Sequence, residues 1–283
     1  MTMQRFDLAY RPRGRVSNGS VGAHGGVDVG GIGVFRDHAR FIQFPDARRI
    51  DIRATMRDPT GETHVRRFEQ RNAIDVYALV DLSASMGFHG AARRLDIVAD
   101  LCAALAFSAT RIGDRFGVIA CDESVRNDLL LPATRARGAA VAAAERLRDA
   151  APRGASAKAL TEAAGLIAGR RKLVLLISDF HWPRDFATRL FSLLAQHDLA
   201  PILVADSTEE RDLPHFGLVE LDDLESGARR LVFMRPSLRR RWLAREAERR
   251  DALRRLALAH GRPPFVMSDS FDADALSRHL LGL

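Results

Sequence analysis

From residue 74 onward, short apolar runs of β type alternate with longer segments of helical periodicity. Strands that alternate with helices are joined by right-handed crossovers and form a mainly parallel sheet. The expected fold class is therefore α/β, a doubly wound and mainly parallel sheet of the Rossmann type with helices on both faces. The predicted strands are 76–81, 115–121, 128–131, 173–178 and 201–205, and the predicted helices are 91–112, 138–150, 157–168 and 184–197.

The last part of the sequence is expected to be less regular. A pair of extended segments, 217–221 and 229–233, would be joined by a turn around Glu225-Ser-Gly227, and a long helix is predicted from Pro236 to His260. A short strand and a final helix would close the edge of the sheet at 265–267 and 273–281. The buried stripe of the long helix is predicted to consist of Leu238, Trp242, Leu253 and Leu256.

The first 71 residues differ in composition from the rest. Between Arg13 and Phe35 the sequence is rich in glycine and poor in large side chains, so burial cannot offset the entropy of ordering it. This stretch is expected to be an irregular, flexible N-terminal arm. Residues 41–71 are dense in charge, and the alternation around His64–Phe68 suggests an edge strand beside the main sheet. The expected domains are 1–71, the arm and charged segment, and 72–283, the α/β domain with its C-terminal extension.

Composition excludes several classes of protein. No apolar run approaches the roughly 20 residues that a membrane-spanning helix needs, because Asp100 interrupts the longest one. The N-terminus lacks the apolar core of a signal peptide, so a cytoplasmic protein is expected. Cys102 and Cys121 have no spacing typical of zinc or redox sites and are predicted to be buried and reduced.

The net charge of +7 points only weakly to nucleic acid. All but two of the 43 basic residues are arginine, the exceptions being Lys158 and Lys172, and such a skew is more simply a coding bias than an adaptation to polyanions. No aromatic platform or zinc-finger spacing accompanies the charge. Nucleic acid is therefore not the expected partner, although an Arg-rich nucleic-acid-binding protein stays an alternative.

The strand at 76–81 leads directly into a run of oxygen-bearing side chains. Asp81, Ser83 and Ser85 follow one another at two-residue spacing in the loop before the next helix. In open α/β sheets, ligands bind at the carboxyl ends of the strands, where this loop would lie. Carboxylate and hydroxyl oxygens suit a hard divalent cation, so the sequence predicts a site for Mg²⁺ or Mn²⁺ with a coordination position left open.

Other loops at the same edge are expected to complete the site. Asp179 follows the strand at 173–178 and can bind the metal through a water or orient a hydroxyl, or it can cap the helix after Pro183. Ser156 is equally well suited as a ligand and as a helix N-cap. Asp122 is predicted to be a turn residue.

Five segments, in this order and spacing, are similar to the DUF58 family of von Willebrand factor A-like proteins. They are Arg49-Ile-Asp51, Arg53-Ala-Thr-Met-Arg57, His64-Val-Arg-Arg-Phe-Glu69, Asp81-Leu-Ser-Ala-Ser-Met86 and Gly113-Asp-Arg-Phe-Gly-Val-Ile119. The resemblance implies a metal-ion-dependent adhesion site made of Asp81, Ser83 and Ser85, with Asp179. The chain departs from the family pattern at Ile52, where tryptophan is common, and at Ser156, where the usual loop has threonine.

Members of this family resemble partners of MoxR-type AAA+ ATPases in chaperone-like maturation of other proteins, including methanol dehydrogenase. The chain looks like the compact soluble subgroup. The expected function is a non-enzymatic, metal-dependent protein-binding module that works with such an ATPase and a client supplying an Asp or Glu to the metal. The alternative enzyme is a Mg²⁺-dependent phosphoryl-transfer enzyme, because an Asp at a strand end also begins such sites. Such an enzyme needs an acid two residues later, where this chain has Ser83.

Overall fold

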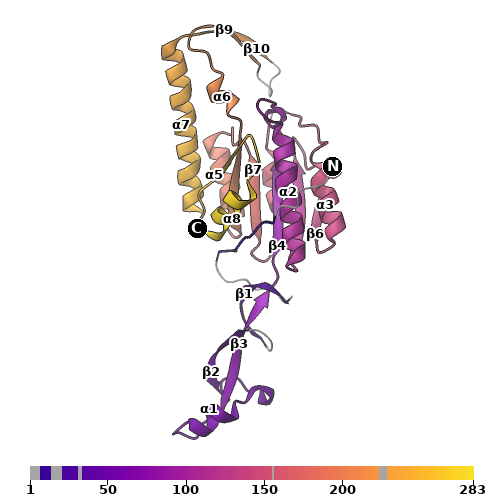
Figure 1. The fold of residues 1–283 in the computed structure, drawn as a ribbon, viewed down its shortest axis with the longest axis vertical. Helices are drawn as coiled ribbons and strands as arrows, with labels where there is room; N and C mark the ends of the chain where they lie inside the picture. The colour runs from indigo at the N-terminus through magenta and orange to yellow at the C-terminus, as the bar shows by residue number, and fades with distance from the viewer. Residues whose placement is uncertain (1–6, 14–20, 31–33, 155, 223–227) are drawn as a thin grey trace. The chain divides into compact units, whose positions relative to one another are not determined.

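The structure is a computed structural model, and it describes residues 7–13, 21–30, 34–154, 156–222 and 228–283 (Figure 1). The chain divides into two compact units. The larger unit consists of Met1–Arg11 and Asp75–Leu283, and the smaller unit is Pro12–Ile74. The chain therefore leaves the larger unit after Arg11 and returns to it at Asp75, whereas the sequence predicted one boundary after residue 71.

A six-stranded sheet forms the centre of the larger unit, in the order β11-β8-β7-β4-β5-β6. All neighbouring strands are parallel except β5 and β6, which are antiparallel. The predicted α/β fold class with a mainly parallel sheet is confirmed. The strands are β4 (Asp75–Asp81), β5 (Arg115–Cys121), β6 (Leu131–Thr134), β7 (Leu173–Ser178), β8 (Asp198–Ala205) and β11 (Phe265–Ser268).

Helices cover both faces of this sheet. On one face, α4, α5 and the C-terminal half of α7 pack on apolar residues of β4, β7 and β8. On the other face, α2 packs against α3, and Figure 1 shows α2 in front of the strands. The helices are α2 (Arg94–Arg111), α3 (Arg137–Arg146), α4 (Ala159–Leu166), α5 (Arg184–Leu194), α6 (Thr208–Arg211), α7 (Pro236–Ala259) and α8 (Ala273–Leu281).

The central strands are buried on both faces of the sheet, so their polar residues lie at the strand ends and in the adjoining loops. Every residue of β7 and β8 is buried, as expected for a parallel strand covered by helices on each face. Because β4 and β7 are parallel neighbours, with Val80 beside Ile177, their carboxyl ends meet at one edge. The loops after β4 and β7 are thereby brought together.

Residues near the N-terminus are held against the larger unit by polar contacts. The Leu8 amide donates to Ser108 Oγ over 2.8 Å, and the Tyr10 hydroxyl donates to Asp114 Oδ2 over 2.6 Å. Arg262 Nη2 donates to the Arg11 carbonyl over 2.7 Å. The described residues before Pro12 are therefore part of the larger unit.

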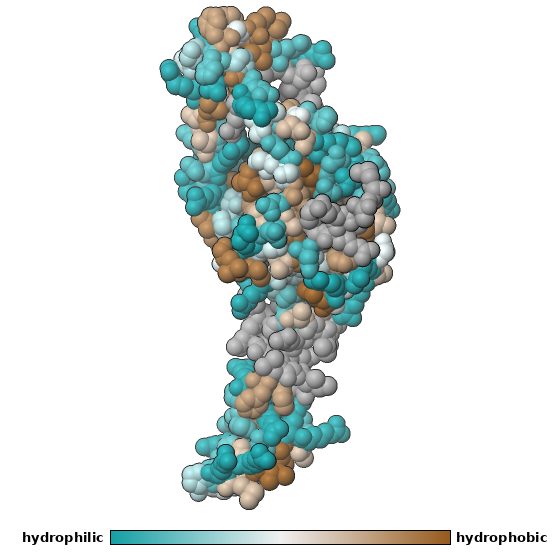
Figure 2. Space-filling view, in the orientation of Figure 1, coloured by the Kyte–Doolittle hydropathy of each residue, from teal (hydrophilic) through white to brown (hydrophobic). Residues whose placement is uncertain are grey.

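A separate hairpin precedes the long helix α7. It consists of β9 (Gly217–Asp222) and β10 (Arg229–Met234), which pair antiparallel as predicted. The predicted turn at 225–227 lies outside the described residues. Figure 2 shows hydrophobic surface over this hairpin. Its exposed apolar side chains include Leu218, Leu231 and Phe233.

The predicted buried stripe of α7 is only partly correct. Leu253 is buried and Leu256 packs on the core, but Trp242 is 45% exposed. Only the C-terminal half of α7 contributes buried residues, Leu253 and Ala257. The periodicity identifies the apolar face of a helix but not the length over which that face meets a partner.

The smaller unit contains a three-stranded antiparallel sheet in the order β1-β3-β2. Its elements are β1 (Val21–Gly30), β2 (Val34–Arg40), η1 (Ala47–Arg49), α1 (Ile52–Arg57) and β3 (His64–Asn72). Two expectations need correction. Residues 21–30 of the expected flexible arm form a strand, because backbone pairing with β3 orders a segment with few large side chains. The expected edge strand at His64–Phe68 is instead the middle strand of this separate sheet. Residues 14–20 and 31–33 of the arm lie outside the described residues.

Candidate metal centre

Asp81 is the last residue of β4 and is fully buried. Its Oδ2 accepts hydrogen bonds from Ser178 Oγ at 2.7 Å and from Trp182 Nε1 at 3.1 Å. Its Oδ1 accepts one from the Ser83 amide at 2.9 Å. Among the described residues, no Lys, Arg or His nitrogen forms an ion pair with Asp81. A buried carboxylate without a basic partner is costly unless a proton or a cation neutralises it.

The two serines of the predicted motif lie next to each other in the loop after β4. Ser83 Oγ is 3.2 Å from Ser85 Oγ, and Ser85 is partly accessible to solvent while Ser83 is buried. A one-turn 3-10 helix, η2 (Ala84–Gly87), carries Ser85 and keeps it close to Ser83. The structure therefore brings Asp81, Ser83 and Ser85 together, and Ser85 is the one that a partner can reach.

Asp179 lies at the same edge, but its carboxylate is already engaged. Its Oδ2 is 3.2 Å from Arg94 Nη1 and 3.2 Å from His181 Nδ1, and its Oδ1 accepts the His181 amide. Arg94 also donates to the Ser85 carbonyl at 2.9 Å. Helix α5 begins after Pro183 without a side-chain cap, so Asp179 is not the cap of that helix.

The two carboxylates differ in how their charge is balanced. Burial, followed by the charge of Asp179, raises the pKa of Asp81 to about 6. Burial also opposes the ionisation of Asp179, but hydrogen bonds and charges from His181, the charge of Arg94 and a hydrogen bond from Ser85 outweigh it and hold its pKa below the usual range. The protein thus neutralises Asp179 itself, whereas no described residue supplies a counter-charge to Asp81.

The backbone after β7 is held in an unusual conformation. Phe180 has a φ of 55°, the left-handed region that non-glycine residues rarely adopt. Its amide donates to Ser178 Oγ over 2.9 Å, and Arg249 of α7 donates to the carbonyls of Asp179 and Phe180 over 2.8 and 3.0 Å. These contacts stabilise the turn that places Asp179 and Trp182 near Asp81.

The structure does not join Ser156 to this cluster. Its hydroxyl accepts the Lys158 amide over 3.2 Å in the turn before α4, but the N-cap of that helix is Lys158, which has no side-chain cap bond. The loop itself is near, because the Ala84 amide donates to the Gly154 carbonyl over 3.1 Å. Residue 155 lies outside the described residues. Asp122 accepts the Ser124 amide and is a turn residue, as predicted.

The side chains present fit a hard divalent cation in their chemistry. One uncompensated carboxylate and two neighbouring hydroxyls are oxygen donors of the kind that Mg²⁺ prefers. Within the described ranges, no group of three or more His, Cys, Asp or Glu side chains is placed to hold a metal. Of Asp81, Ser83 and Ser85, only Asp81 is one of these four residue types. A metal site built from the three would therefore use mainly hydroxyl ligands.

Lysines are not placed for phosphoryl chemistry at this edge. Lys172 comes just before β7, at the opposite end of that strand from Ser178 and Asp179, and its Nζ donates to the Ala168 carbonyl over 2.8 Å. Lys158 is exposed at the start of α4. Neither lysine contacts Asp81 among the described residues.

Four residues that the sequence did not predict for the site contact its carboxylates. Trp182 and Ser178 bond to Asp81, whereas Arg94 and His181 bond to Asp179. Ser178 and His181 lie within two positions of Asp179, so the sequence indicated that they would be near the site. Arg94 offered a weaker signal, a charged residue at the start of a mostly apolar helix.

Comparison with known proteins places the chain in a family. The family model described as "Protein of unknown function DUF58" matches residues 40–252. A Paracoccus denitrificans protein described as "Uncharacterized protein in moxR 3'region" is 39% identical over 98 residues, which make up 33% of this chain and 90% of that protein. An uncharacterized protein of Mycobacterium tuberculosis is 28% identical over 236 residues, 82% of this chain and 73% of that protein.

Among solved structures, BatB from Bacteroides thetaiotaomicron is similar with a TM-score of 0.46 and 14% sequence identity, over 74% of this chain and 97% of that one. Within the described part of this chain, no helix combines the length and the apolar character needed to cross a membrane. The family match spans well over half of the sequence and includes both the Arg49–Asp51 segment and the loop of Asp81, Ser83 and Ser85. The chain therefore belongs to the DUF58 family.

Proposed function

We propose that this protein is a non-enzymatic, metal-dependent protein-binding module that acts with a MoxR-type AAA+ ATPase in the assembly or maturation of client proteins. The observation that carries the proposal is the buried Asp81 carboxylate, which has no basic partner among the described residues and lies beside two serine hydroxyls. A site that lacks one positive charge and offers oxygen donors is suited to a divalent cation.

Each residue has a separate role in this proposal. Asp81, Ser83 and Ser85 would hold Mg²⁺ or Mn²⁺, and the bound ion would offer a coordination position to an Asp or Glu of the partner. Ser178 and Trp182 orient the Asp81 carboxylate through its Oδ2. Asp179, fixed by Arg94 and His181, would accept a hydrogen bond from the Ser85 hydroxyl and so orient that ligand.

Accessibility supports binding of a partner at this site. Ser85 is partly exposed, whereas Asp81 and Ser83 are buried. A partner can therefore approach from the side of Ser85 without any rearrangement of the sheet. The link to a MoxR-type ATPase is supported by the Paracoccus denitrificans relative, which is described by its place in the moxR 3' region.

Capture of the purified MoxR-type ATPase from the same genome tests the proposal. The wild-type protein should retain the ATPase in Mg²⁺, lose it in EDTA and regain it when Mg²⁺ is restored. The double variant Ser83→Ala, Ser85→Ala should not retain it in either condition. A matched control is Ser192→Ala, which removes a hydroxyl bonded only within α5 and should bind as the wild type does.

Two results would contradict the proposal. Equal capture of the ATPase by the double variant and the wild type would exclude these hydroxyls as ligands. Capture that is insensitive to EDTA would exclude the metal. Circular dichroism of the double variant separates loss of binding from loss of the fold.

A further inference from the structure

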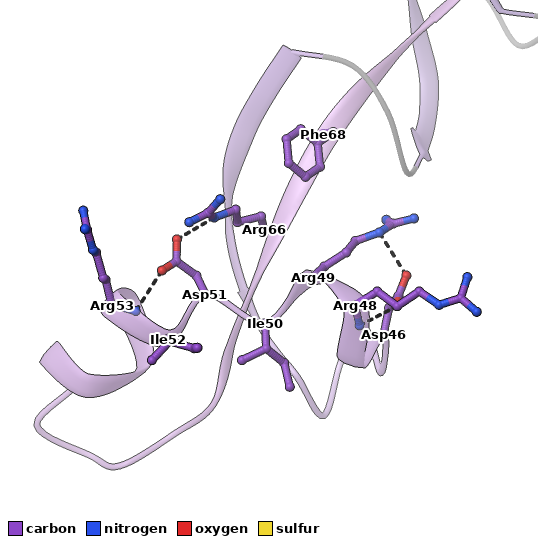
Figure 3. A pocket seen from close by; sticks show the side chains of 9 residues that line it. All are labelled: Asp46, Arg48, Arg49, Ile50, Asp51, Ile52, Arg53, Arg66 and Phe68. Carbon is purple, nitrogen blue, oxygen red and sulfur yellow. Dashed lines mark hydrogen bonds and ion pairs between the residues drawn. The ribbon is translucent and has the colours of Figure 1, made fainter.

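The smaller unit contains an open hollow that has no part in the proposed metal centre. Its volume is about 660 Å³, and it is formed by η1, the first turn of α1 and part of β3 (Figure 3). The lining comprises four arginines, two aspartates and three apolar residues. Charged and apolar side chains thus share one concave surface.

Both aspartates of the hollow are occupied by contacts within the protein. Asp46 pairs with Arg49 Nε at 2.9 Å. Asp51 caps α1 through the Arg53 and Ala54 amides, and its other oxygen accepts Arg66 Nε at 2.7 Å. The hydrogen bonds from Arg66, His38 and Ala54 hold the pKa of Asp51 well below its usual range. Asp51 therefore stays ionised, and both aspartates serve the fold through contacts within this unit.

Two arginines of the hollow have no such partner. Arg48 and Arg53 are exposed, and among the described residues neither guanidinium forms a hydrogen bond or an ion pair. In Figure 3 no dashed line ends on either guanidinium group. Because Arg49 and Arg66 neutralise the two aspartates, Arg48 and Arg53 leave the hollow with two uncompensated positive charges.

Apolar side chains lie between these charges in the sequence and on the same surface. Ile50 is 37% exposed and Ile52 is 69% exposed, and both line the hollow. Met56 of α1 is also largely exposed. Figure 2 shows hydrophobic and hydrophilic surface next to one another in this unit. Large exposed apolar side chains that are rimmed by charge are typical of a protein-binding surface.

We propose that this hollow binds an acidic, amphipathic segment of another protein, with carboxylates at Arg48 and Arg53 and an apolar side chain against Ile50 and Ile52. Charge complementarity selects an acidic segment, since both unpaired groups are guanidiniums that bind carboxylates in a fork. The isoleucines favour a peptide over a nucleic acid. A nucleic acid would leave them uncovered, and Phe68 is the single aromatic residue that lines the hollow.

The proposal does not rest on the metal-dependent function. No residue of the hollow belongs to the Asp81 cluster, so binding here should be the same in Mg²⁺ and in EDTA. Loss of metal-dependent capture and loss of binding in the hollow are therefore separate experimental outcomes.

Fluorescence anisotropy with the full-length protein and three labelled probes tests the proposal. The probes are a peptide of repeating Glu-Leu-Asp units, a peptide of equal charge with serine in place of leucine, and a single-stranded oligothymidylate of equal charge. The leucine-containing peptide should bind most tightly. Its affinity should fall as salt rises from about 0.05 to about 0.5 M, because the contacts are exposed ion pairs.

Variants identify the residues that bind the probe. Arg48→Glu with Arg53→Glu should weaken binding of the leucine-containing peptide about tenfold or more, because attraction becomes repulsion at both positions. Ile52→Thr, which keeps the branched side chain, should weaken it by a smaller factor. The matched control is Arg240→Glu with Arg241→Glu, which makes the same charge change on exposed residues of α7 and should bind as the wild type does.

Several outcomes would overturn the proposal. These are an absence of binding to the leucine-containing peptide, equal losses in the two double variants, and tighter binding of the oligothymidylate. Equal affinity for the serine- and leucine-containing peptides would also overturn it, because the isoleucines would then contribute nothing. Circular dichroism of the Arg48→Glu, Arg53→Glu variant excludes unfolding as the cause of a loss.

Discussion

Arg94 and Asp179 form an ion pair in the interior of the larger unit. Nη1 of Arg94 lies 3.2 Å from Oδ2 of Asp179, and each side chain is only 2% exposed. The pair joins the start of α2, the helix that follows the loop of Asp81 and Ser85, to the residue after β7, the strand beside β4. A buried pair of this kind ties the geometry of the candidate metal centre to the stability of the fold.

Replacement of Arg94 by methionine should lower the free energy of unfolding by about 3–5 kcal/mol, because it removes the permanently charged partner of the buried Asp179 carboxylate and leaves that carboxylate to His181. Addition of Asp179→Asn should recover part of that loss, since the variant then buries no charge at position 179. Urea denaturation of the wild type, both single variants and the double variant measures the coupling. A double variant whose loss equals the sum of the two single losses would show that the pair is not coupled.

Mg²⁺ should stabilise the wild type and not the Asp81→Asn variant. A ligand that binds only the folded state adds about 2.7 kcal/mol at a concentration 100 times its Kd. Without metal, Asp81→Asn should differ little in stability from the wild type, because it removes a buried charge that repels Asp179 but also replaces one hydrogen-bond acceptor with a donor. Thermal unfolding with and without Mg²⁺ measures both effects. The same Mg²⁺ shift in both proteins would refute the assignment of Asp81 as a ligand.

Gly90→Ala should destabilise the protein by about 1–3 kcal/mol. A Cβ at Gly90 would lie 2.2 Å from Thr208 Oγ1 and 2.5 Å from an oxygen of Asp206, which accepts the amides of Gly90 and Ala91. The displaced Asp206 would leave these amides without their acceptor.

The matched change Gly165→Ala should stabilise the protein by about 0.5–1 kcal/mol, because Gly165 lies inside α4 with open space around it. Chemical denaturation of both variants checks the pair of predictions. A neutral Gly90→Ala would show that the loop before α2 adapts without cost.

His197 should contribute a loss of stability as the pH falls below about 6.5, opposite in sign to the gain from Asp81, whose pKa burial raises to about 6. Burial lowers the pKa of His197, whose Nε2 donates to the Ile167 carbonyl over 2.5 Å while its buried Nδ1 has no hydrogen-bond partner in the described part of the chain. Below the unfolded-state pKa the unfolded chain binds a proton that the folded protein resists, so unfolding is favoured. Above that pH both states are neutral at this position and the contribution of His197 is constant.

His197→Gln, which retains an amide donor, should remove the contribution of His197 to the pH dependence of the free energy of unfolding. Urea denaturation of the wild type and the variant between about pH 8 and pH 5.5 gives the comparison. Identical pH profiles would show that His197 is not the group responsible.

Much of the larger unit was predictable because its signals are local. The apolar run 173–177 of β7 identified a covered strand, and Pro236 marked the start of α7. The meeting of Asp81 and Asp179 was predictable as well, since parallel neighbouring strands end at one edge. The spacing of Ser83 and Ser85 needed only one loop to bring their hydroxyls together.

The features that the sequence did not predict depend on contacts between residues far apart in the chain. Nothing in the sequence near Arg94 indicates that it pairs with Asp179, 85 residues away. The exposure of Trp242 depends on where α7 ends its contact with the core. The strand β1 was missed because its order comes from backbone pairing with β3, which a side-chain pattern does not report.

The attachment of Leu8–Arg11 to the larger unit makes Pro12–Ile74 a nested module with two covalent junctions. Both junctions lie near the consecutive residues Asp114 and Arg115. Tyr10, just before the first junction, bonds to Asp114, and Asp75, just after the second, pairs with Arg115. A shortened protein that begins at residue 75 would lack Leu8, which is buried, and would leave Arg262 without the Arg11 carbonyl as an acceptor. A deletion that removes Pro12–Ile74 and joins Arg11 to Asp75 by a short linker keeps all residues of the larger unit.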